Sequence, residues 1–486
     1  MTQAANTIVF ISDNHVQWAS GCYGAEAART PAIDSIAKRG VRFDNAYCAS
    51  PLCCPSRAAI ATGRYPHETG FYDNCLVYDG SVPSWMHRVR DAGGKAVSVG
   101  KLHFRSTDDD NGFTEERIPM HILNGRGGTT MLLRAAGGEV PAVGQWDLYT
   151  RQAGVGATPY QHYDRDITRS AIEWLRETAE AGSDQPWVLY VSYASPHPPF
   201  RVPPHIAQEF EAAGMPLPPA FRSAERTDHP AARHLRDIMG TPATDDEDLM
   251  RHVIAFYLGL VSHMDRQIGE VLGEVEGLDL GDVRLIYTAD HGDMLGTNGL
   301  MGKSNVYERA LKVPLVMCGP DIAAGSVRDD LVSHVDLFPT ILDSVGVPLA
   351  APDEDLPGRS LFAGPDDDRD LFAEYHATGT SGGAFVLRHG AHKLIHYADH
   401  PPQLFDIDRD PDETNDLAGL PEYADVLADL AARLRAVCDP DAVDRAAKQA
   451  QADRVEAYGG RDALISEGAL VYTPPPGKPA EVREIR

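Results

Sequence analysis

Three short apolar runs occur in the first 300 residues, and each ends in polar side chains. The runs lie at 7–12 (TIVFIS), 188–200 (VLYVSYASPHPPF) and 284–293 (RLIYTADHGD). Apolar runs of this length that are rich in β-branched residues predict strands buried on both faces of a sheet. Asp13, His197 and Asp290 are therefore expected at the carboxyl ends of strands.

Helix-like stretches separate these runs. They cover 31–40, 165–182 and 248–277. Strands that alternate with helices predict an α/β fold, with a large, mostly parallel or mixed central sheet flanked by helices. Because ligands of such sheets bind at the carboxyl ends of the strands, the polar ends of the three runs mark a candidate site.

The pattern changes twice further along the chain. Residues 200–245 are rich in Pro, Ala and charge without a clear period, which predicts a long surface excursion that covers or borders the site. After about residue 365, short strand-like segments and one helix, 423–437, predict a small antiparallel sheet with a helix. We therefore expect a large α/β domain over 1–365 that carries the site. An α+β subdomain is expected over 366–486, and its Pro-rich tail, 474–486, is expected to be an arm across a neighbour or a disordered end.

Composition narrows the range of partners. The chain has 486 residues, which suggests one large domain and one smaller one, and its formal net charge is −27. So acidic a chain is a poor ligand for nucleic acid or an anionic membrane. The seven cysteines have no regular spacing, the first residues lack the features of a secretion signal, and no apolar run is long enough to span a bilayer. We expect a cytoplasmic protein without nucleic-acid or membrane partners.

The most specific signal is the string CCPSR at 53–57, which is followed at 62–64 by TGR. Pro55 suits the first turn of a helix, so Cys53 is expected just ahead of a helix that begins there, where free N–H groups favour an anion. The string matches the C-x-P-S-R pattern by which sulfatases are marked for oxidation of cysteine to formylglycine. Over most of its length the chain resembles the sulfatases of the alkaline phosphatase superfamily, with motifs most similar to the choline sulfatase and phosphonate monoester hydrolase branch.

The resemblance implies a modified nucleophile at Cys53 and a formylglycine-generating enzyme as the partner that installs it. Cys54 occupies the unrestricted position of the pattern, so Cys53 is the residue to be modified. The aldehyde would be hydrated to two hydroxyls on one carbon. One would attack sulfur, and loss of the proton from the other would let sulfate leave by C–O cleavage.

A second cluster predicts one divalent metal. By resemblance its ligands are Asp13, Asn14, Asp290 and His291, together with Cys53 after modification. The family more often has Asp where Asn14 stands and Asn where His291 stands. Oxygen donors favour Ca²⁺. The imidazole ligand makes Mn²⁺ an alternative, and Mg²⁺ is a second alternative.

Charged and proton-carrying residues complete the implied site. Lys101 and Lys303 would hold the sulfate oxygens, and Arg57 would orient the formylglycine hydroxyl. Strand alternation would direct Lys101 and His103 to the same face, and His103 would be the base for sulfate release. Either His197 or Lys303 would protonate the leaving alcohol.

Two asparagines, Asn74 and Asn305, are further candidate ligands of the oxyanion. Asn74 matches a polar position near the bound anion in choline sulfatases and phosphonate hydrolases, and Asn305 is expected to help in the same way.

Three functions fit these motifs. The favoured one is hydrolysis of an organic sulfate monoester. A phosphonate monoester or phosphodiester hydrolase would use the same site, and an inactive homologue would bind a sulfated ligand without turnover. The alcohol is left open: a choline-type alcohol would need an aromatic or acidic cage, for which Trp18, Trp85, Trp146 and Tyr149 are available. The resemblance also implies a homo-oligomer.

Overall fold

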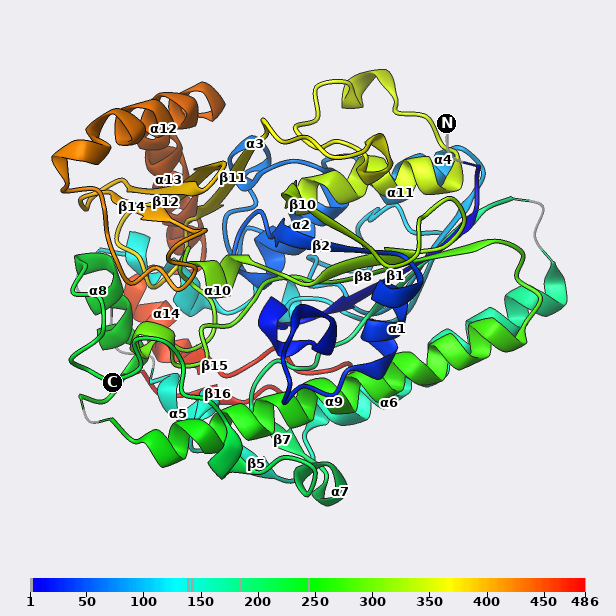
Figure 1. Ribbon diagram of the computed structural model, residues 1–486, viewed down its shortest axis with the longest axis horizontal. Coiled ribbons are helices and arrows are strands. Elements are labelled where there is room, and N and C mark those ends of the chain that lie inside the picture. The colour runs from blue at the N-terminus through cyan, green and yellow to red at the C-terminus, as the bar shows by residue number, and fades with distance from the viewer. Residues whose placement is uncertain (1–2, 138–139, 141–143, 183–184, 244, 486) are drawn as a thin grey trace.

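The central sheet of the computed structural model has eight strands and confirms the predicted α/β fold (Figure 1). The structure describes residues 3–137, 140, 144–182, 185–243 and 245–485. The strand order is β10-β2-β9-β8-β1-β6-β3-β4. The strands are β1 (Asn6–Ser12), β2 (Val41–Tyr47), β3 (Lys95–Lys101), β4 (Glu115–Met120), β6 (Trp187–Ser192), β8 (Val283–Ala289), β9 (Leu315–Cys318) and β10 (Ser326–Ser333).

Most neighbours in this sheet are parallel, and β9 is antiparallel to both β2 and β8. The central strand β1 is buried on both faces. Val9 and Ile11 pack into one core cluster, whereas Ile8 and Phe10 pack into the cluster on the opposite face. This explains why the strand is an unbroken apolar run rather than an alternating one.

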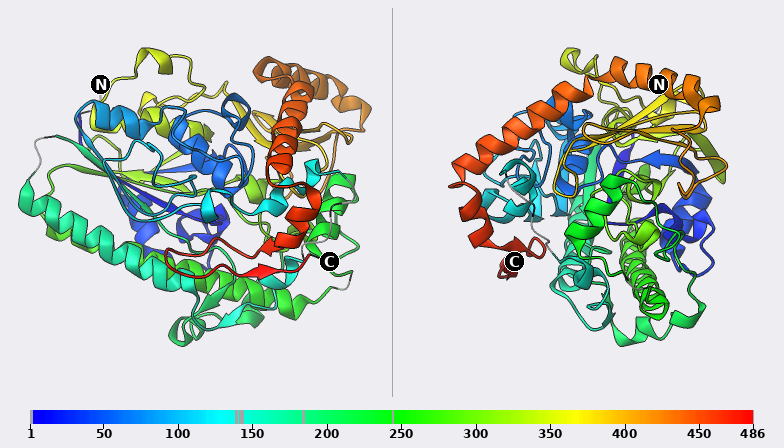
Figure 2. Two further views of the ribbon diagram at one scale, coloured as in Figure 1. Left: turned by 180° about the vertical axis from the view of Figure 1, so that it is seen from behind. Right: turned by 90° about the vertical axis from the view of Figure 1, so that its left-hand side faces the viewer.

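Helices cover both faces of the sheet, as Figures 1 and 2 show. The three predicted helices are confirmed, and they pack on one face. They are α1 (Pro31–Arg39), α6 (Pro159–Ala181) and α9 (Glu247–Gly277). Helix α6 begins six residues earlier than predicted, because Thr158 caps it through the N–H of Gln161 and Pro159 occupies its first turn. The other face carries α2 (Cys53–Thr62), α4 (Trp85–Asp91) and α11 (Leu337–Val345).

Four adjacent parallel strands, β8, β1, β6 and β3, end at the same edge of the sheet. The residues that follow β8 and β1 are Asp290 and Asp13, while β3 ends at Lys101 itself. Segments separated by as many as 277 positions in the sequence are thus brought together by strand pairing alone.

The excursion at 200–245 contains more regular structure than its composition predicts. It holds the short strand β7 (Arg201–Val202), the single turn α7 (Pro204–Ala207) and the helix α8 (Pro230–Met239). Ala231, Leu235 and Ile238 are buried along one side of α8. The prediction of a segment without a period was therefore wrong for 230–239, where the spacing of these residues is helical.

The small antiparallel sheet is present in the order β11-β12-β13-β14. Its strands are β11 (Asp370–Tyr375), β12 (Ala384–His389), β13 (His392–Tyr397) and β14 (Gln403–Asp406), and the predicted helix is α12 (Ala424–Val437). Two further helices, α13 (Pro440–Ala457) and α14 (Arg461–Glu467), follow.

The C-terminal tail folds back on its own chain. The strand β16 (Val482–Arg483) pairs with β15 (Ala469–Leu470), so the described part of the tail forms a hairpin with its own chain. In Figures 1 and 2 this red hairpin leaves α14 and crosses the molecule toward α6. Within the described residues, no helix has the length and apolar character needed to cross a bilayer.

Candidate active site

Cys53 is the first residue of α2 rather than the residue just ahead of it. Its Sγ lies 3.3 Å from Nε2 of His291 and 3.9 Å from Oδ1 of Asp13. Burial, aided by the negative charge of Asp13, raises the pKa of the Cys53 thiol to about 11. Unmodified Cys53 is therefore a protonated thiol at neutral pH and a weak nucleophile.

The predicted metal ligands converge around this thiol. One donor atom from each of Asp13, Cys53, Asp290 and His291 lies within 4.8 Å of the others, and all four residues are buried. Nδ1 of His291 donates to the carbonyl of Gly292 at 3.0 Å, which leaves Nε2 facing the cluster. Burial lowers the pKa of His291, so the ring is neutral and has a lone pair available for a metal.

Asn14, the remaining predicted ligand, is oriented by a hydrogen bond of its own. Its Nδ2 donates to Oδ2 of Asp293 at 2.6 Å, so its Oδ1 points the other way and accepts from Nζ of Lys303 at 2.6 Å. Asp293 also accepts from the N–H groups of Leu295 and Gly302. The sequence analysis did not single out Asp293, although it lies in the same DHGD string as two of the ligands.

Two buried cations neutralise the carboxylates. Arg57 donates from Nε to Asp290 at 3.0 Å and from Nη2 to Asp13 at 3.3 Å, and Lys101 donates to Asp13 through Nζ. Burial would raise the pKa of Asp13, but the charges of these two residues and of Lys303 hold it well below its ordinary value. The hydrogen bonds of Arg57 in this structure go to groups other than Cys53, and two of them hold the carboxylates of Asp13 and Asp290.

Two hydroxyls missed by the sequence analysis hold this cluster in place. Oγ of Ser56 donates to the carbonyl of Asp290 at 2.5 Å, and Oγ of Ser192 accepts from Nη1 of Arg57 at 2.8 Å. Ser56 belongs to the CCPSR string, and its place in that pattern could have identified it as a site residue. Ser192 ends β6, and no local signal distinguishes it from other strand serines.

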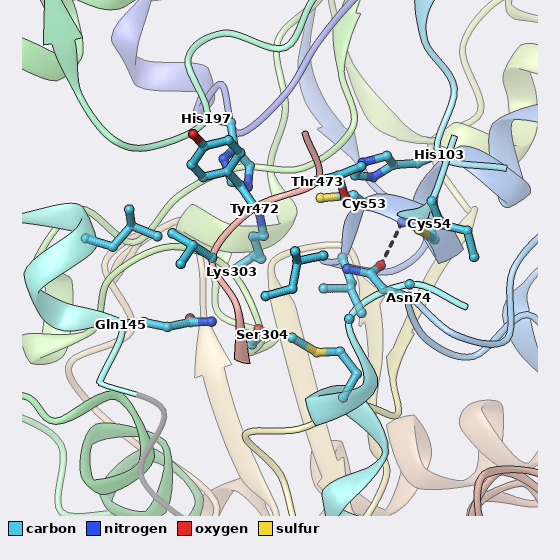
Figure 3. Close-up of a pocket in the computed structure, with 18 of the residues that line it drawn as sticks. Cys53, Cys54, Asn74, His103, Gln145, His197, Lys303, Ser304, Tyr472 and Thr473 are labelled. Atoms are coloured by element: carbon cyan, nitrogen blue, oxygen red, sulfur yellow. Dashed lines mark hydrogen bonds between the residues drawn. The ribbon is translucent and has the colours of Figure 1, made fainter. Parts of the chain in front are cut away.

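Cys53 opens into a pocket that encloses about 750 Å³, part of it open to solvent. Figure 3 shows several of the residues that line it. The lining includes four more predicted site residues: Asn74, His103, His197 and Lys303. Asn305 is not among the lining residues, because it faces a separate small cavity between α8 and the C-terminal sheet.

His103 reaches the pocket by a backbone geometry that the sequence did not predict. The strand β3 ends at Lys101, and His103 has a φ of 56°, so strand alternation does not continue to the histidine as predicted. Both side chains still reach the site, because the chain turns after the strand. Asn74 lies across from the start of α2, where its Oδ1 accepts from the N–H of Cys54 at 3.1 Å (Figure 3).

The two pocket histidines are neutral. Burial, together with the charges of Lys101 and Arg57, holds the pKa of His103 well below its ordinary value, and neither of its ring nitrogens has a hydrogen-bond partner. Burial and the charge of Lys303 do the same for the pKa of His197, whose Nδ1 contacts the carbonyl of Pro198 at 2.9 Å. Lys303 is different: nearby acidic groups outweigh its burial, so its pKa lies above the ordinary value and it stays charged.

The outer wall of the pocket contains aromatic residues. Of the aromatic candidates for an alcohol cage, Tyr149 lines the pocket, and Trp18, Trp85 and Trp146 do not. Tyr160 from α6 and Tyr472 from the C-terminal hairpin also line it. No local pattern in the sequence marked Tyr472 as a residue of this pocket.

An α/β fold of this topology, with a buried cysteine placed among carboxylates and cations at the strand ends, defines a hydrolase of anionic esters. Residues 5–347 match the Sulfatase family, and residues 296–439 match the family "N-sulphoglucosamine sulphohydrolase, C-terminal". The chain belongs to the sulfatase family and is a sulfuric ester hydrolase.

Similar proteins are found among sequences and structures. A choline-sulfatase of Rhizobium meliloti (strain 1021) is 31% identical over 452 residues, with 89% of this chain and 87% of that protein covered. An arylsulfatase K of Danio rerio is 28% identical, with 87% and 81% covered. The phosphonate monoester hydrolase of Agrobacterium radiobacter shares the fold, with a TM-score of 0.71, 21% identity, and 89% and 95% of the two chains covered. A protein solved with D-glucosamine-2-N,6-O-disulfate as its substrate has a TM-score of 0.73 at 23% identity, with 90% and 99% covered.

Proposed function

We propose that the protein hydrolyses an organic sulfate monoester with a formylglycine formed from Cys53 and with one divalent metal ion. The observation that carries this proposal is the position of Cys53. Its side chain faces the pocket and lies among the donor atoms of Asp13, Asp290 and His291. A hydroxyl on its Cβ would be in reach of a metal held by those donors and of a substrate in the pocket.

The residues present fit a hard divalent cation. They offer two carboxylates, the amide oxygen of Asn14 and one neutral imidazole, whose partners Asp293 and Gly292 fix the orientation of the donor atoms. We favour Ca²⁺ because oxygen donors dominate, with Mn²⁺ and Mg²⁺ as alternatives. The bound ion would supply positive charge that lowers the pKa of the attacking hydroxyl and balances charge on the sulfate.

The cations of the chain divide into two groups. Arg57 and Lys101 hold the carboxylates of Asp13 and Asp290, and Lys101 would in addition contact a sulfate oxygen. Lys303 reaches the pocket and holds the sulfate oxygens, aided by Asn74 at the opposite side. Asn305 faces another cavity, so it would not contact the sulfate itself. It could affect the sulfate site only indirectly, by positioning the backbone next to Lys303.

Two histidines are placed to move protons. Neutral His103, which has no hydrogen-bond partner, accepts a proton from the modified residue as sulfate leaves. Lys303, which is charged and lines the pocket next to Cys53, would donate a proton to the departing alcohol. His197 also lines the pocket and is the alternative donor, but its neutral ring would first have to bind a proton.

The test combines modification and turnover. Protein is produced with a formylglycine-generating enzyme, and peptide mass spectrometry is expected to show conversion of CH₂SH to CHO at Cys53, with Cys54 unchanged as the internal control. Cys53→Ser should lose multiple turnover, because a single hydroxyl cannot release sulfate by C–O cleavage, while Cys438→Ser should not. Full activity with unmodified Cys53 would refute the mechanism.

The same preparation tests the alternative activity. Rates are compared on 4-nitrophenyl sulfate and on a 4-nitrophenyl phosphonate monoester. A much larger kcat/KM on the phosphonate would establish the phosphonate hydrolase instead, and binding without turnover of either would establish an inactive homologue. The expected homo-oligomer is tested by light scattering of the same sample.

A further inference from the structure

We infer that one face of helix α6 positions His197: Asp164 holds the turn that carries this histidine, and Tyr160 holds its ring. This inference rests on the proposed function, in which His197 lies beside the departing alcohol, and it adds two residues that act through His197. Asp164 is fully buried and is not among the residues that line the pocket, so it would act on the reaction without contacting the substrate.

The carboxylate of Asp164 binds the backbone of the segment that follows β6. Its Oδ1 accepts from the N–H of Ala194 at 2.7 Å, and its Oδ2 accepts from the N–H of Ser195 at 3.1 Å. The N–H of His197 donates to the carbonyl of Ala194 at 3.1 Å, so these residues form one turn. Because both carboxylate oxygens are used, the side chain fixes the direction of the turn as well as its distance from α6.

The same turn is also held by the strand that precedes the predicted metal ligands. The N–H of Asp13 donates to the carbonyl of Ser195 at 3.2 Å, and the N–H of Tyr193 donates to the carbonyl of Ile11 at 2.8 Å. The turn is thus held by Asp164 from the helix side and by β1 from the sheet side. Loss of one carboxylate oxygen should shift the turn rather than unfold it, because the contacts with β1 remain.

The imidazole of His197 is held on two sides. Its Nδ1 donates to the carbonyl of Pro198 at 2.9 Å, so a proton or a substrate can bind only at Nε2. Tyr160 lies one helical turn before Asp164 in α6, and its ring lies 5.5 Å from that of His197 at 76°. The hydroxyl of Tyr160 donates to the carbonyl of Thr473 at 2.9 Å, which fixes the tyrosine ring in turn.

Positioning of this kind has a large effect on rate. A misplacement of about 1 Å in a group that acts on the substrate can lower a rate about a hundredfold. Burial raises the pKa of Asp164 to about 6, so at pH 8 its carboxylate is ionised and both oxygens accept. Asp164→Asn keeps the shape of the side chain, but it replaces one acceptor by an NH₂ group that faces an N–H donor.

A double-mutant cycle tests whether Asp164 acts through His197. The substrate is phenyl sulfate, whose alcohol is a poorer leaving group than 4-nitrophenol and depends more on the groups beside it. At pH 8, kcat and KM are measured for the modified parent enzyme, for Asp164→Asn, for His197→Asn and for the double variant.

We expect Asp164→Asn and His197→Asn each to lower kcat/KM at least about tenfold, with the same division between kcat and KM. The double variant should lie within about twofold of His197→Asn, because the position of a side chain that is absent no longer matters. Losses that multiply in the double variant would overturn the inference, since Asp164 would then act by another route, such as its charge. A His197→Asn variant with the kcat/KM of the parent enzyme would overturn it as well.

Asp265→Asn is the matched control. Asp265, in α9, is also fully buried, and it accepts from the N–H groups of Ala32 and Ile33 at 3.0 and 2.9 Å, at the start of α1. Neither Asp265 nor α1 is among the residues that line the pocket. Asp265→Asn should lower the resistance to urea about as much as Asp164→Asn and keep kcat/KM within about twofold. Equal losses of kcat/KM in these two variants would overturn the inference.

Tyr160 provides a second test that does not depend on the folding of Asp164→Asn. Tyr160→Leu should lower kcat/KM in the parent enzyme but not in His197→Asn, and Tyr160→Phe, which keeps the ring, should recover most of the loss. A loss of equal size in both backgrounds would overturn the inference. The proposed function fails instead if the parent enzyme turns over only the phosphonate ester, and the same cycle is then measured on that ester.

Discussion

Replacing Asn14 by Asp would give this site the acidic residue that its family more often has, and we predict that it destabilises the protein. Nδ2 of Asn14 lies 2.6 Å from a carboxylate oxygen of Asp293, and both residues are fully buried. In Asn14→Asp two carboxylates would face each other at that distance. With an effective dielectric constant of about 20, the repulsion between two unit charges at this distance is about 6 kcal/mol.

The pair would avoid this repulsion by binding one proton. A repulsion of that size raises the pKa of the second carboxyl of the pair above its ordinary value. A folded-state pKa that is raised above the unfolded value gives stability that is lost as the pH rises, by about 1.4 kcal/mol per unit. The deficit of Asn14→Asp should therefore be larger at pH 8 than at pH 6, by at most the ~3 kcal/mol that the repulsion alone would give over two pH units. Lys303 lies at the same 2.6 Å from the other side of residue 14 and attracts the new carboxylate about as strongly, so the measured difference should be well below this limit.

The assay is urea unfolding at pH 6 and pH 8 in the presence of a chelator. Asn45→Asp is the matched control, since it adds the same charge at a partly exposed position. Added Ca²⁺ should reduce the stability deficit of Asn14→Asp at pH 8, because the new carboxylate would lie beside the predicted metal ligands. A deficit that is the same at both pH values, or no larger than that of Asn45→Asp, would refute the electrostatic account.

Three further predictions follow from buried groups. Arg57→Met removes the ion pairs to Asp13 and Asp290, so unfolding by urea should show a loss of stability of about 3–5 kcal/mol, against about 0.5 kcal/mol for Arg64→Met at a partly exposed position. Equal losses would contradict this prediction. Burial would raise the pKa of Glu374, but His67 and His376 hold it at about 2. Glu374→Gln should therefore lower the free energy of unfolding by at most about 3 kcal/mol at pH 6. This loss of stability should shrink as the pH falls from 4.5 toward 2. A loss at pH 3 as large as that at pH 6 would show that the charge pairing of Glu374 with the two histidines does not stabilise the protein. Ca²⁺ at a hundredfold excess over its Kd should raise the unfolding free energy by about 2.7 kcal/mol, and Asp13→Asn should abolish this gain.

The sequence predicted the part of the site that strand ends determine. Asp13 and Asp290 follow apolar runs directly, so their convergence needs only the rule that parallel strands end at one edge. The boundaries of α1, α9 and α12 were also predicted to within a residue, because their apolar periods and flanking residues are local signals.

Residues placed by long-range contacts could not be predicted. The φ of 56° at His103 depends on how the chain leaves β3, and the position of Tyr472 depends on a hairpin that follows two helices the pattern did not reveal. Asn305 lies two residues from Lys303 yet faces a separate cavity, which spacing alone cannot show. Such positions are set by packing between segments far apart in sequence.

The charges around Cys53 explain how so acidic a protein can bind an anion. The chain carries a net charge of −27, yet around Cys53 three buried carboxylates, Asp13, Asp290 and Asp293, are matched by three buried cations, Arg57, Lys101 and Lys303. A divalent ion would add a surplus of two positive charges. Because Asn14 is neutral where a carboxylate would reduce this surplus, the site would attract a sulfate ester at short range. At longer range, the acidic surface is screened within about 10 Å at moderate ionic strength. We therefore expect affinity for the substrate to depend on these local residues rather than on net charge.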